Sequence, residues 1–237
     1  MKGALVVITE APLVVGSAAD LRPHLTSSQN TALQRRFLAD TIKATQNLEG
    51  MDFFVAQGTG RGRAAVAGDL PSPFRLISQT GPDIGGRLSN LFDRLFRRGY
   101  EHVLILGSHS PDLPACLIEQ GSEILAKGKA DFVLGPSERG GFYLVGLSEP
   151  CGRLFGDIPW DSPRLSRQAL SCARGLGLRV HRLPQWYDIF SIEDLRRHFT
   201  YYSLRRDAAR GASYKSATGT YLRKIRARLR PGLPGTC

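Results

Sequence analysis

Short apolar runs alternate along the chain with segments in which apolar positions recur every three or four residues. The runs are typical of strands, and those without polar residues are typical of strands buried on both faces of a sheet. They lie at residues 4–8, 51–56, 74–78, 103–106, 131–134, 142–147 and 178–183. The periodic segments predict helices from Ser27 or Ser28 to about residue 48, at 84–98, after Pro114, at 165–174 and at 192–199.

Strands and helices of these lengths in alternation predict an α/β fold, with a parallel or mostly parallel sheet and helices on both faces. The fourth predicted strand is the centre of this pattern. Gly107 ends it, and a helix begins only after Pro114. Ligands bind at the carboxyl ends of strands in open α/β sheets. The polar side chains expected there are those of His109, Ser110 and Asp112.

Composition narrows the class of protein. The 237 residues are enough for one sizeable core, and 42% hydrophobic and 22% charged residues are ordinary for a globular domain. No apolar run approaches the roughly 18 residues of a membrane span. Glu10 and Pro12 interrupt the apolar start, which therefore predicts a core strand rather than a signal peptide. Four scattered cysteines without a C-x-x-C pair indicate reduced thiols and a cytoplasmic protein.

The net charge of +11 is placed unevenly. After Thr200 there are nine Lys and Arg residues and one acid, so that stretch alone carries +8. It contains a basic amphipathic helix, predicted at 220–229, with Leu222, Ile225 and Leu229 on one face. Either this helix lies on an anionic surface, such as the inner face of the membrane or another polyanion, or its apolar residues dock on the domain. No specific nucleic acid is expected as a partner.

Five segments, in order, resemble a known family. They are Q-T-G-P-D-I-G-G-R-L (79–88), G-S-H-S-P-D-L-P (107–114), G-P-S-E-R-G-G-F-Y-L-V-G-L (135–147), I-P-W-D-S-P-R (158–164) and Y-D-I-F-S-I-E-D-L (187–195). Together they resemble the small glycosyltransferase-like proteins called radical-SAM/selenodomain-associated or arsenosugar-biosynthesis-type transferases, of the nucleotide-diphospho-sugar transferase superfamily. The resemblance implies one GT-A-like domain over residues 1–199, followed by a basic tail at 200–237.

The resemblance also implies roles for particular residues. Glu138 and Asp161 are the expected catalytic residues, and Asp188 and His109 stand where the family has metal-ligand positions for Mn²⁺ or Mg²⁺. The residues expected to contact the nucleotide or substrate are Arg87, Gly107, Ser108, His109, Asp112, Arg139, Gly140, Gly141 and Trp160.

The chain departs from the family pattern where charge matters. The family's first Asp in the central motif is His109 here, the Asp of its E-D-G-G segment is Arg139, and the second Asp of its closing motif is Phe190. In a loose alignment, Ala18 and Asp20 stand where the family has a phosphate-binding Lys and Arg, and Arg22 is a substitute. Divalent cations on a diphosphate prefer carboxylate oxygens. Two interpretations follow: either the site binds a nucleotide diphosphate without metal, through Arg139 and His109, or catalysis has been lost and the fold serves as a binding module.

Three functions follow. The first is transfer of a sugar from a nucleotide-diphosphate donor to an unknown acceptor. The second is a catalytically inactive nucleotide-binding or scaffold module. The third is nucleotidyl transfer to a small phosphorylated acid, which depends most on the missing carboxylates. Several site residues also have purely structural interpretations: Asp112 as a helix cap, Gly140 and Gly141 as turn residues, Trp160 as a core residue, Arg87 as a solvated charge and His109 as a neutral replacement.

Overall fold

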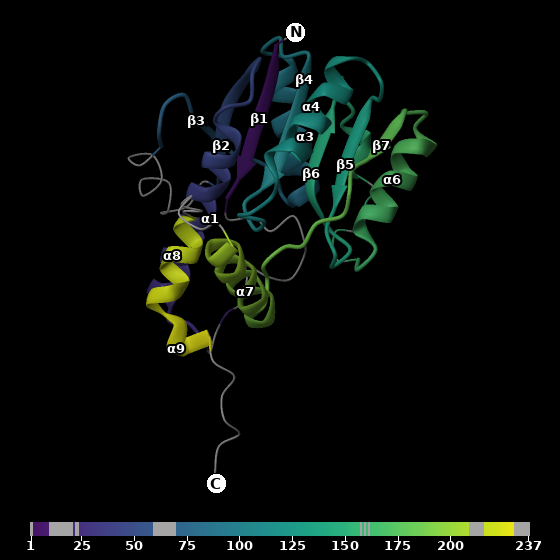
Figure 1. The fold of residues 1–237 in the computed structure, drawn as a ribbon. Coiled ribbons are helices and arrows are strands. Elements are labelled where there is room, and N and C mark those ends of the chain that lie inside the picture. Colours follow the sequence, from purple (N-terminus) through teal and green to yellow (C-terminus); the bar gives the residue numbers. More distant parts are fainter. Residues whose placement is uncertain are drawn as a thin grey trace.

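A computed structural model of the chain describes residues 2–9, 21, 24–58, 70–156, 158, 160, 162–208 and 216–229. Its sheet has seven strands in the order β3-β2-β1-β4-β6-β5-β7, with β4 at the centre (Figure 1). The strands are β1 Gly3–Ile8, β2 Met51–Gln57, β3 Arg75–Ser78, β4 His102–Gly107, β5 Phe132–Pro136, β6 Phe142–Leu147 and β7 Val180–Arg182. All seven match the strands that the apolar runs predict.

The sheet is mostly parallel, with one exception. Strand β6 pairs antiparallel with both β4 and β5, whereas the other neighbouring pairs are parallel. The cause is the connection at residues 137–141, which is long enough for a hairpin but too short for a crossover to a parallel strand. The carboxyl ends of the other six strands share one edge of the sheet, and the candidate site is built there.

Eight helices are described. They are α1 Ser27–Thr45, α3 Ile84–Phe96, α4 Ala115–Ala126, α5 Arg153–Gly156, α6 Leu165–Gly175, α7 Ile192–Ala208, α8 Ala217–Lys224 and α9 Arg226–Leu229. Helices α3, α5 and α6 pack on one face of the sheet, and α1 and α4 pack on the other. Each face of the sheet has its own hydrophobic core. Alternate residues of β1 belong to the two cores, which explains why its apolar run is continuous.

Helix α1 begins one residue earlier than its predicted caps allow. Thr26 is the cap: its side chain accepts from the backbone N–H of Gln29, and the Gln29 side chain accepts from the backbone N–H of Thr26. Ser27 and Ser28 are therefore the first two helical residues. This reciprocal arrangement satisfies two of the donors that a helix N-terminus leaves free.

The C-terminal helices differ most from the prediction. Helix α7 was expected to end near residue 199 and instead runs on to Ala208. The single helix expected at 220–229 is two helices, α8 and α9, which meet at Ile225. Leu222 and Leu229 are buried in a third hydrophobic core, to which α1 and α7 also contribute. The apolar face of this basic segment is docked on the domain, not left open for a membrane surface.

A buried acid fixes this docking. Asp40, on α1, accepts hydrogen bonds from the Ser216 hydroxyl at 2.8 Å, the Ala217 N–H at 2.7 Å and the Thr218 N–H at 2.8 Å. Asp40 thus caps the N-terminus of α8 from a neighbouring helix, where a negative charge also meets the positive end of the helix dipole. No described helix is long and apolar enough to cross a membrane.

Candidate substrate-binding site

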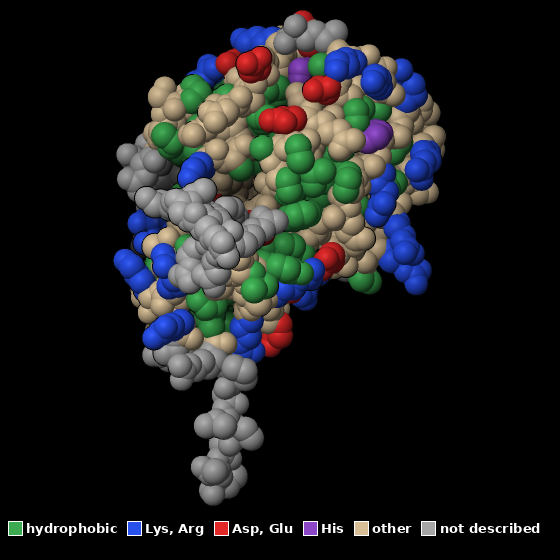
Figure 2. All heavy atoms as spheres, viewed as in Figure 1, with side chains coloured by type: hydrophobic (Ala, Val, Ile, Leu, Met, Phe, Trp, Pro, Cys, Tyr) green, Lys and Arg blue, Asp and Glu red, His purple; other side chains and the backbone are tan. Residues whose placement is uncertain are grey.

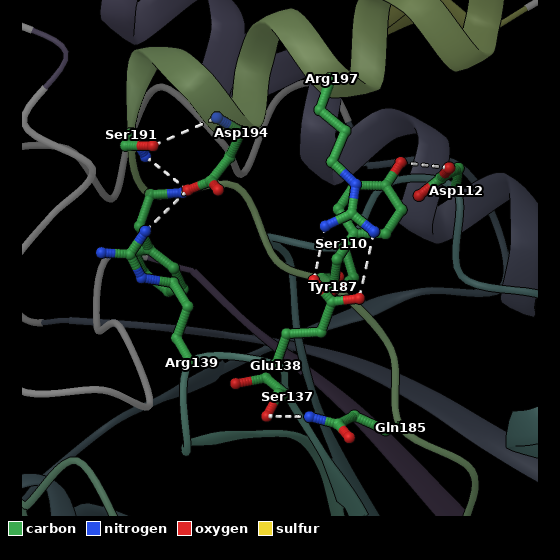
Figure 3. Close-up of polar contacts among 11 residues, drawn as sticks. Ser110, Asp112, Ser137, Glu138, Arg139, Gln185, Tyr187, Ser191, Asp194 and Arg197 are labelled. Carbon is green, nitrogen blue, oxygen red and sulfur yellow. Dashed lines mark hydrogen bonds and ion pairs between the residues drawn. The ribbon is translucent and has the colours of Figure 1, made fainter.

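Two of the motifs that carry the family resemblance meet at the carboxyl edge of the sheet. The segment 186–190 crosses this edge from β5 to β4. It begins with the Trp186 N–H donating to the Pro136 carbonyl at 3.1 Å and ends with the Ile189 N–H donating to the His109 carbonyl at 2.9 Å. The buried Ser110 hydroxyl donates to the Tyr187 carbonyl at 3.0 Å (Figure 3). The residues after β4 and the closing motif therefore form one structure.

At the β4 end, the two positions where the family resemblance implies carboxylates are packed against each other. The half-buried His109 ring stacks on Phe190 with centroids 4.6 Å apart and an angle of 7° between the planes. The edge of the pair is closed by Phe37 of α1, whose ring centroid lies 6.1 Å from that of His109. We call Phe37, His109 and Phe190 the aromatic region.

The surroundings of His109 favour its neutral imidazole. Burial lowers its pKa, although a hydrogen bond to the Ile189 carbonyl acts in the opposite direction. The Nδ1 atom lies 3.1 Å from that carbonyl oxygen, which can only accept, so Nδ1 carries the proton and Nε2 presents a lone pair. A neutral ring in this tautomer offers a phosphate neither a positive charge nor a second N–H donor.

These residues do not fit the divalent cation that the superfamily resemblance implies. His109 and Phe190 supply no carboxylate oxygen, and the described residues contain no group of three or more His, Cys, Asp or Glu placed to hold a metal ion. Asp188 is the remaining acid of the closing motif. Its Oδ1 atom is buried without a hydrogen-bond partner among the described residues. One carboxylate and one neutral imidazole are a weaker ligand set for Mg²⁺ or Mn²⁺ than the several carboxylates that the family resemblance implies.

Asp188 has an altered acidity. Burial raises the pKa of Asp188 to about 6, the neighbouring Asp194 carboxylate adds to the rise, and Ser137 and Arg139 oppose it. The cause is the cost of holding a charge away from water. A carboxyl group with this pKa changes protonation state close to neutral pH, which suits proton transfer better than an ordinary aspartate does.

Asp112 does not cap the helix that follows it. Helix α4 begins after Pro114 and has no side-chain cap. Asp112 instead accepts a hydrogen bond from the Tyr187 hydroxyl at 2.5 Å, and that hydroxyl lies 2.9 Å from Nδ1 of His198 on α7. The Asp112 carboxylate thus connects the end of β4 to the closing motif and to α7.

The hairpin between β5 and β6 reaches toward α7 through two charged side chains (Figure 3). Arg197 donates to both carboxylate oxygens of Glu138, at 2.5 and 3.1 Å. Arg139 donates to Asp194 at 3.1 Å and keeps half of its side chain exposed. Asp194 also accepts from the backbone N–H groups of Phe190 and Ser191. Glu138 is therefore held in an ion pair, and Arg139 is paired but accessible.

Gly140 brings this hairpin against the start of α6. Its φ is +88°, and a Cβ atom there would lie 1.8 Å from the Pro163 carbonyl oxygen. Its own carbonyl accepts from the Ser166 N–H at 2.8 Å. The Gly141 carbonyl accepts from the Ser137 N–H at 2.9 Å within the turn. Both glycines thus have the structural role of turn residues, and only a glycine fits at 140.

Of the remaining predicted site residues, Gly107 and Ser108 lie directly before His109, and Trp160 and Arg87 lie elsewhere in the fold. Trp160 packs against Phe142 and Phe155 and donates to the Phe155 carbonyl at 3.3 Å. These contacts support its interpretation as a core residue. Arg87 is half-buried on α3, with no polar side-chain partner among the described residues. Gly107 is the last residue of β4, and Ser108 after it is buried. Asp161 and the positions 18, 20 and 22 lie outside the described residues.

Beside the hairpin lies a groove that the sequence interpretation missed. Its volume is about 760 Å³, and arginines from the hairpin, α6 and β7 line it: Arg139, Arg164, Arg167, Arg174 and Arg182. We call it the arginine groove. Figure 2 shows Lys and Arg side chains gathered along the β7 and α6 side of the molecule. A sequence signal existed, because residues 164, 167 and 174 share one face of a helix. It was overlooked because the excess charge was assigned to the tail.

A family model, described as an uncharacterized protein conserved in bacteria (DUF2064), matches residues 41–162. The chain belongs to this family. The matched region contains β2 to β6 and therefore both the end of β4 and the β5–β6 hairpin. No match was found among curated proteins.

Solved structures show the fold of this DUF2064 protein more widely. A protein from Desulfovibrio desulfuricans G20, provisionally named a nucleotide-diphospho-sugar transferase, is 23% identical, with a TM-score of 0.82 over 97% of both chains. CMP:2-keto-3-deoxy-manno-octonic acid synthetase in complex with CTP is 10% identical, with a TM-score of 0.53 over 86% of this chain and all of the other. A cytidylyltransferase from Leptospira borgpetersenii is 12% identical, with a TM-score of 0.50 over 98% and 97%. The expected nucleotide-diphospho-sugar transferase fold is confirmed.

Proposed function

We propose that this DUF2064 protein binds a nucleotide-diphosphate sugar at the carboxyl edge of β1 and β4 and transfers the sugar to an acceptor. The observation that carries the proposal is the meeting of the central and closing motifs at that edge, through the Ile189–His109 and Ser110–Tyr187 hydrogen bonds. The names of the similar structures, a nucleotide-diphospho-sugar transferase and a synthetase with bound CTP, support a nucleotide donor.

The donor binds without a divalent cation held by the residues at 109 and 190. Their carboxylates are replaced by a stacked aromatic pair, so the negative charge of the diphosphate needs another partner. Arg139 is that partner, because its guanidinium is half-exposed and meets a carboxylate through one hydrogen bond at 3.1 Å. A phosphate group accepts a bidentate pair of hydrogen bonds from arginine. Asp194 retains its two backbone donors when Arg139 turns toward a diphosphate.

In the transfer step, the bond between the anomeric carbon of the sugar and the phosphate oxygen breaks, and the nucleoside diphosphate leaves with the electron pair. The acceptor hydroxyl oxygen forms the new bond to that carbon and gives up its proton. Asp188 accepts this proton. It lies on the segment between the ends of β5 and β4, and its pKa of about 6 leaves it mostly ionised at pH 7. Glu138, whose two oxygens are held by Arg197, is a positioning residue.

A binding module without activity is the second candidate. The aromatic region favours it, because the two substitutions remove carboxylates that would hold a cation against the leaving diphosphate. Nucleotidyl transfer is the third. The likeness to the two cytidylyltransferase-type folds supports it, but the missing carboxylates count against it more than against sugar transfer.

A thermal-shift panel of UDP-, GDP-, ADP- and CDP-linked sugars, each with EDTA or with Mn²⁺, tests the proposal. Ligand at about 100 times its Kd stabilises the fold by about 2.7 kcal/mol, which is several degrees for a chain of this size. The expected result is a shift with at least one donor that EDTA does not change. Arg139→Gln reduces this shift, whereas the matched control Arg94→Gln, on α3, leaves it unchanged. A panel without any shift contradicts the proposal.

The same donor then separates transfer from binding alone. An active enzyme hydrolyses the donor slowly, with water as the acceptor, and so releases nucleoside diphosphate. The release is faster when a better acceptor is supplied. Asp188→Asn is expected to bind the donor and to release no product. A donor that binds and is never consumed, with a broad set of hydroxyl acceptors, identifies the inactive module.

A further inference from the structure

The arginine groove carries positive charge that the fold does not compensate. Two of its charged side chains are already paired outside the groove: Arg139 with Asp194, and Glu138 with Arg197. Glu138 is the one acid among the described residues that line the groove. The other four arginines, Arg164, Arg167, Arg174 and Arg182, form no ion pair or side-chain hydrogen bond with a described residue.

The arrangement of these four differs from scattered surface charge. Arg164 is the N-cap residue of α6, Arg167 and Arg174 lie on that helix, and Arg182 ends β7; all four line the same cavity of about 760 Å³. Guanidinium groups stay protonated at any relevant pH, so repulsion between them persists unless an anion enters. Each presents a planar fork of donors that matches the oxygens of a phosphate group. The groove therefore favours a ligand with several closely spaced negative oxygens.

We propose that the arginine groove binds the phosphate or diphosphate group of the acceptor, so that the acceptor substrate is a phosphorylated compound. As a statement about the acceptor this rests on the proposed function, whereas the anion site itself does not.

The position of the groove supports this role. Ser137 and Glu138 line the groove, and the Glu138 N–H donates to the Trp186 carbonyl at 3.0 Å. Asp188, the proposed base, follows two residues later on the same crossing segment. A phosphate held by α6 and β7 thus leaves the remainder of its molecule beside the hairpin, on the path from the groove to the end of β4. Gly140 keeps the hairpin against the start of α6 and so maintains this distance.

Titration calorimetry with inorganic pyrophosphate, using the full chain at low salt, tests the anion site. The groove variant is Arg167→Gln/Arg174→Gln. The matched control is Arg35→Gln/Arg94→Gln, which removes the same charge from two exposed helical positions outside the groove. Loss of two charge-assisted contacts predicts binding that is at least about tenfold weaker in the groove variant. The control is expected within twofold of wild type. Equal binding by wild type and groove variant overturns the proposal.

The phosphate has two sources, a soluble metabolite or a lipid headgroup, and vesicles distinguish them. Sedimentation is compared with phosphatidylcholine vesicles with and without phosphatidic acid. Phosphatidic-acid-dependent sedimentation that the groove variant loses and the control keeps assigns the phosphate to a lipid. Pyrophosphate binding with no such groove-dependent sedimentation assigns it to a soluble compound. Absence of both effects in the wild-type chain overturns the proposal.

Nucleotide binding separates the failure of this inference from the failure of the proposed function. The groove variant is expected to bind the donor identified by the thermal-shift panel within twofold of wild type, because it keeps Arg139, the proposed partner of the donor diphosphate. Donor binding with no groove-dependent pyrophosphate binding rejects the groove and keeps the transferase. Groove-dependent pyrophosphate binding with no donor in the panel rejects the transferase and keeps the anion site.

Discussion

The carboxyl edge of the sheet has two neighbouring regions with opposite character. At the end of β4, where the family resemblance places carboxylates, His109 and Phe190 form a neutral stack that continues into the third hydrophobic core. Beyond β5 and β7, five arginines surround one groove. The difference teaches that an edge without carboxylates at residues 109 and 190 can still present positive charge, because arginines of the hairpin, α6 and β7 supply it.

The aromatic region also has a partner that the arginine groove lacks. Phe190 belongs to the same core as Leu222 and Leu229 of the C-terminal helices, which dock through Asp40. An apolar residue at 190 extends this core, whereas a carboxylate would have to be buried beside it. Phenylalanine at 190 is therefore compatible with the docked C-terminal helices, whereas a carboxylate at 190 is not.

Phe190→Asp is expected to have the largest effect on the comparison. It removes a large buried side chain and places an unpaired charge in an apolar core, which predicts a loss of about 3–5 kcal/mol in the free energy of unfolding. Urea denaturation measures it, and Phe190→Leu serves as the conservative control, with a loss under about 1.5 kcal/mol. Unchanged stability of Phe190→Asp would show that the aromatic region is not part of the core.

The double variant His109→Asp/Phe190→Asp sharpens the same point. It restores two carboxylates near Asp188, so Mn²⁺ is expected to raise the melting temperature of this variant and to leave wild type unchanged. NaCl at the same ionic strength controls for salt. Equal stabilisation of both proteins by Mn²⁺ would place the metal elsewhere.

Asp188→Asn is predicted to stabilise the protein above pH 6. The pKa of Asp188 rises from an ordinary 3.8 to about 6 on folding, so the protonated form favours the folded state. In wild type this contribution is complete below pH 4 and is lost as the pH rises through 6. Two pKa units correspond to about 3 kcal/mol, which the variant gains at pH 8 and not at pH 4. Urea denaturation at the two pH values measures it, and a pH-independent difference contradicts the raised pKa.

Asp40→Ala tests the attachment of the C-terminal helices. It removes three hydrogen bonds that hold the start of α8, with an expected loss of about 1–2 kcal/mol. Limited proteolysis should then cut within α8 and α9 faster than in wild type. Asp93→Ala, at a half-buried position on α3, is a suitable control. An unchanged cleavage rate would show that Leu222 and Leu229 suffice for docking.

The smallest effect is expected in the arginine groove. Arg167→Gln/Arg174→Gln changes the free energy of unfolding by less than about 0.5 kcal/mol, because exposed charges contribute little to stability. At low salt the variant is slightly more stable than wild type, because repulsion between the arginines is relieved. High salt screens this repulsion and removes the difference in stability. Urea denaturation at two salt concentrations measures both. A clear loss of stability would assign these arginines a structural role instead of a binding role.

Sequence reasoning succeeded where the signal is local. The continuous apolar runs at 4–8 and 103–106 became the buried strands β1 and β4. The antiparallel direction of β6 was also readable in principle, because five residues cannot make a crossover. The C-terminal boundary of α7 could not be predicted in this way. This helix packs against α8, which follows a segment of sequence without an apolar pattern.

The site divides in the same way. The stack of His109 on Phe190 joins residues far apart in sequence and was foreshadowed only by the family resemblance. The row formed by Arg164, Arg167 and Arg174 is local and could have been found, but Arg182 joins it only through the sheet. Ion pairs such as Glu138 with Arg197 depend on where α7 lies, and no pattern in the sequence gives that placement.

The most direct test of the central claim is the affinity of the best-binding nucleotide-diphosphate sugar, measured by calorimetry with EDTA and again with Mn²⁺. A site that has replaced its metal ligands by an aromatic pair, and compensates phosphate charge with arginine, predicts Kd values within about twofold of each other. A Kd that is tenfold or more weaker in EDTA, which is a difference of about 1.4 kcal/mol, would contradict it.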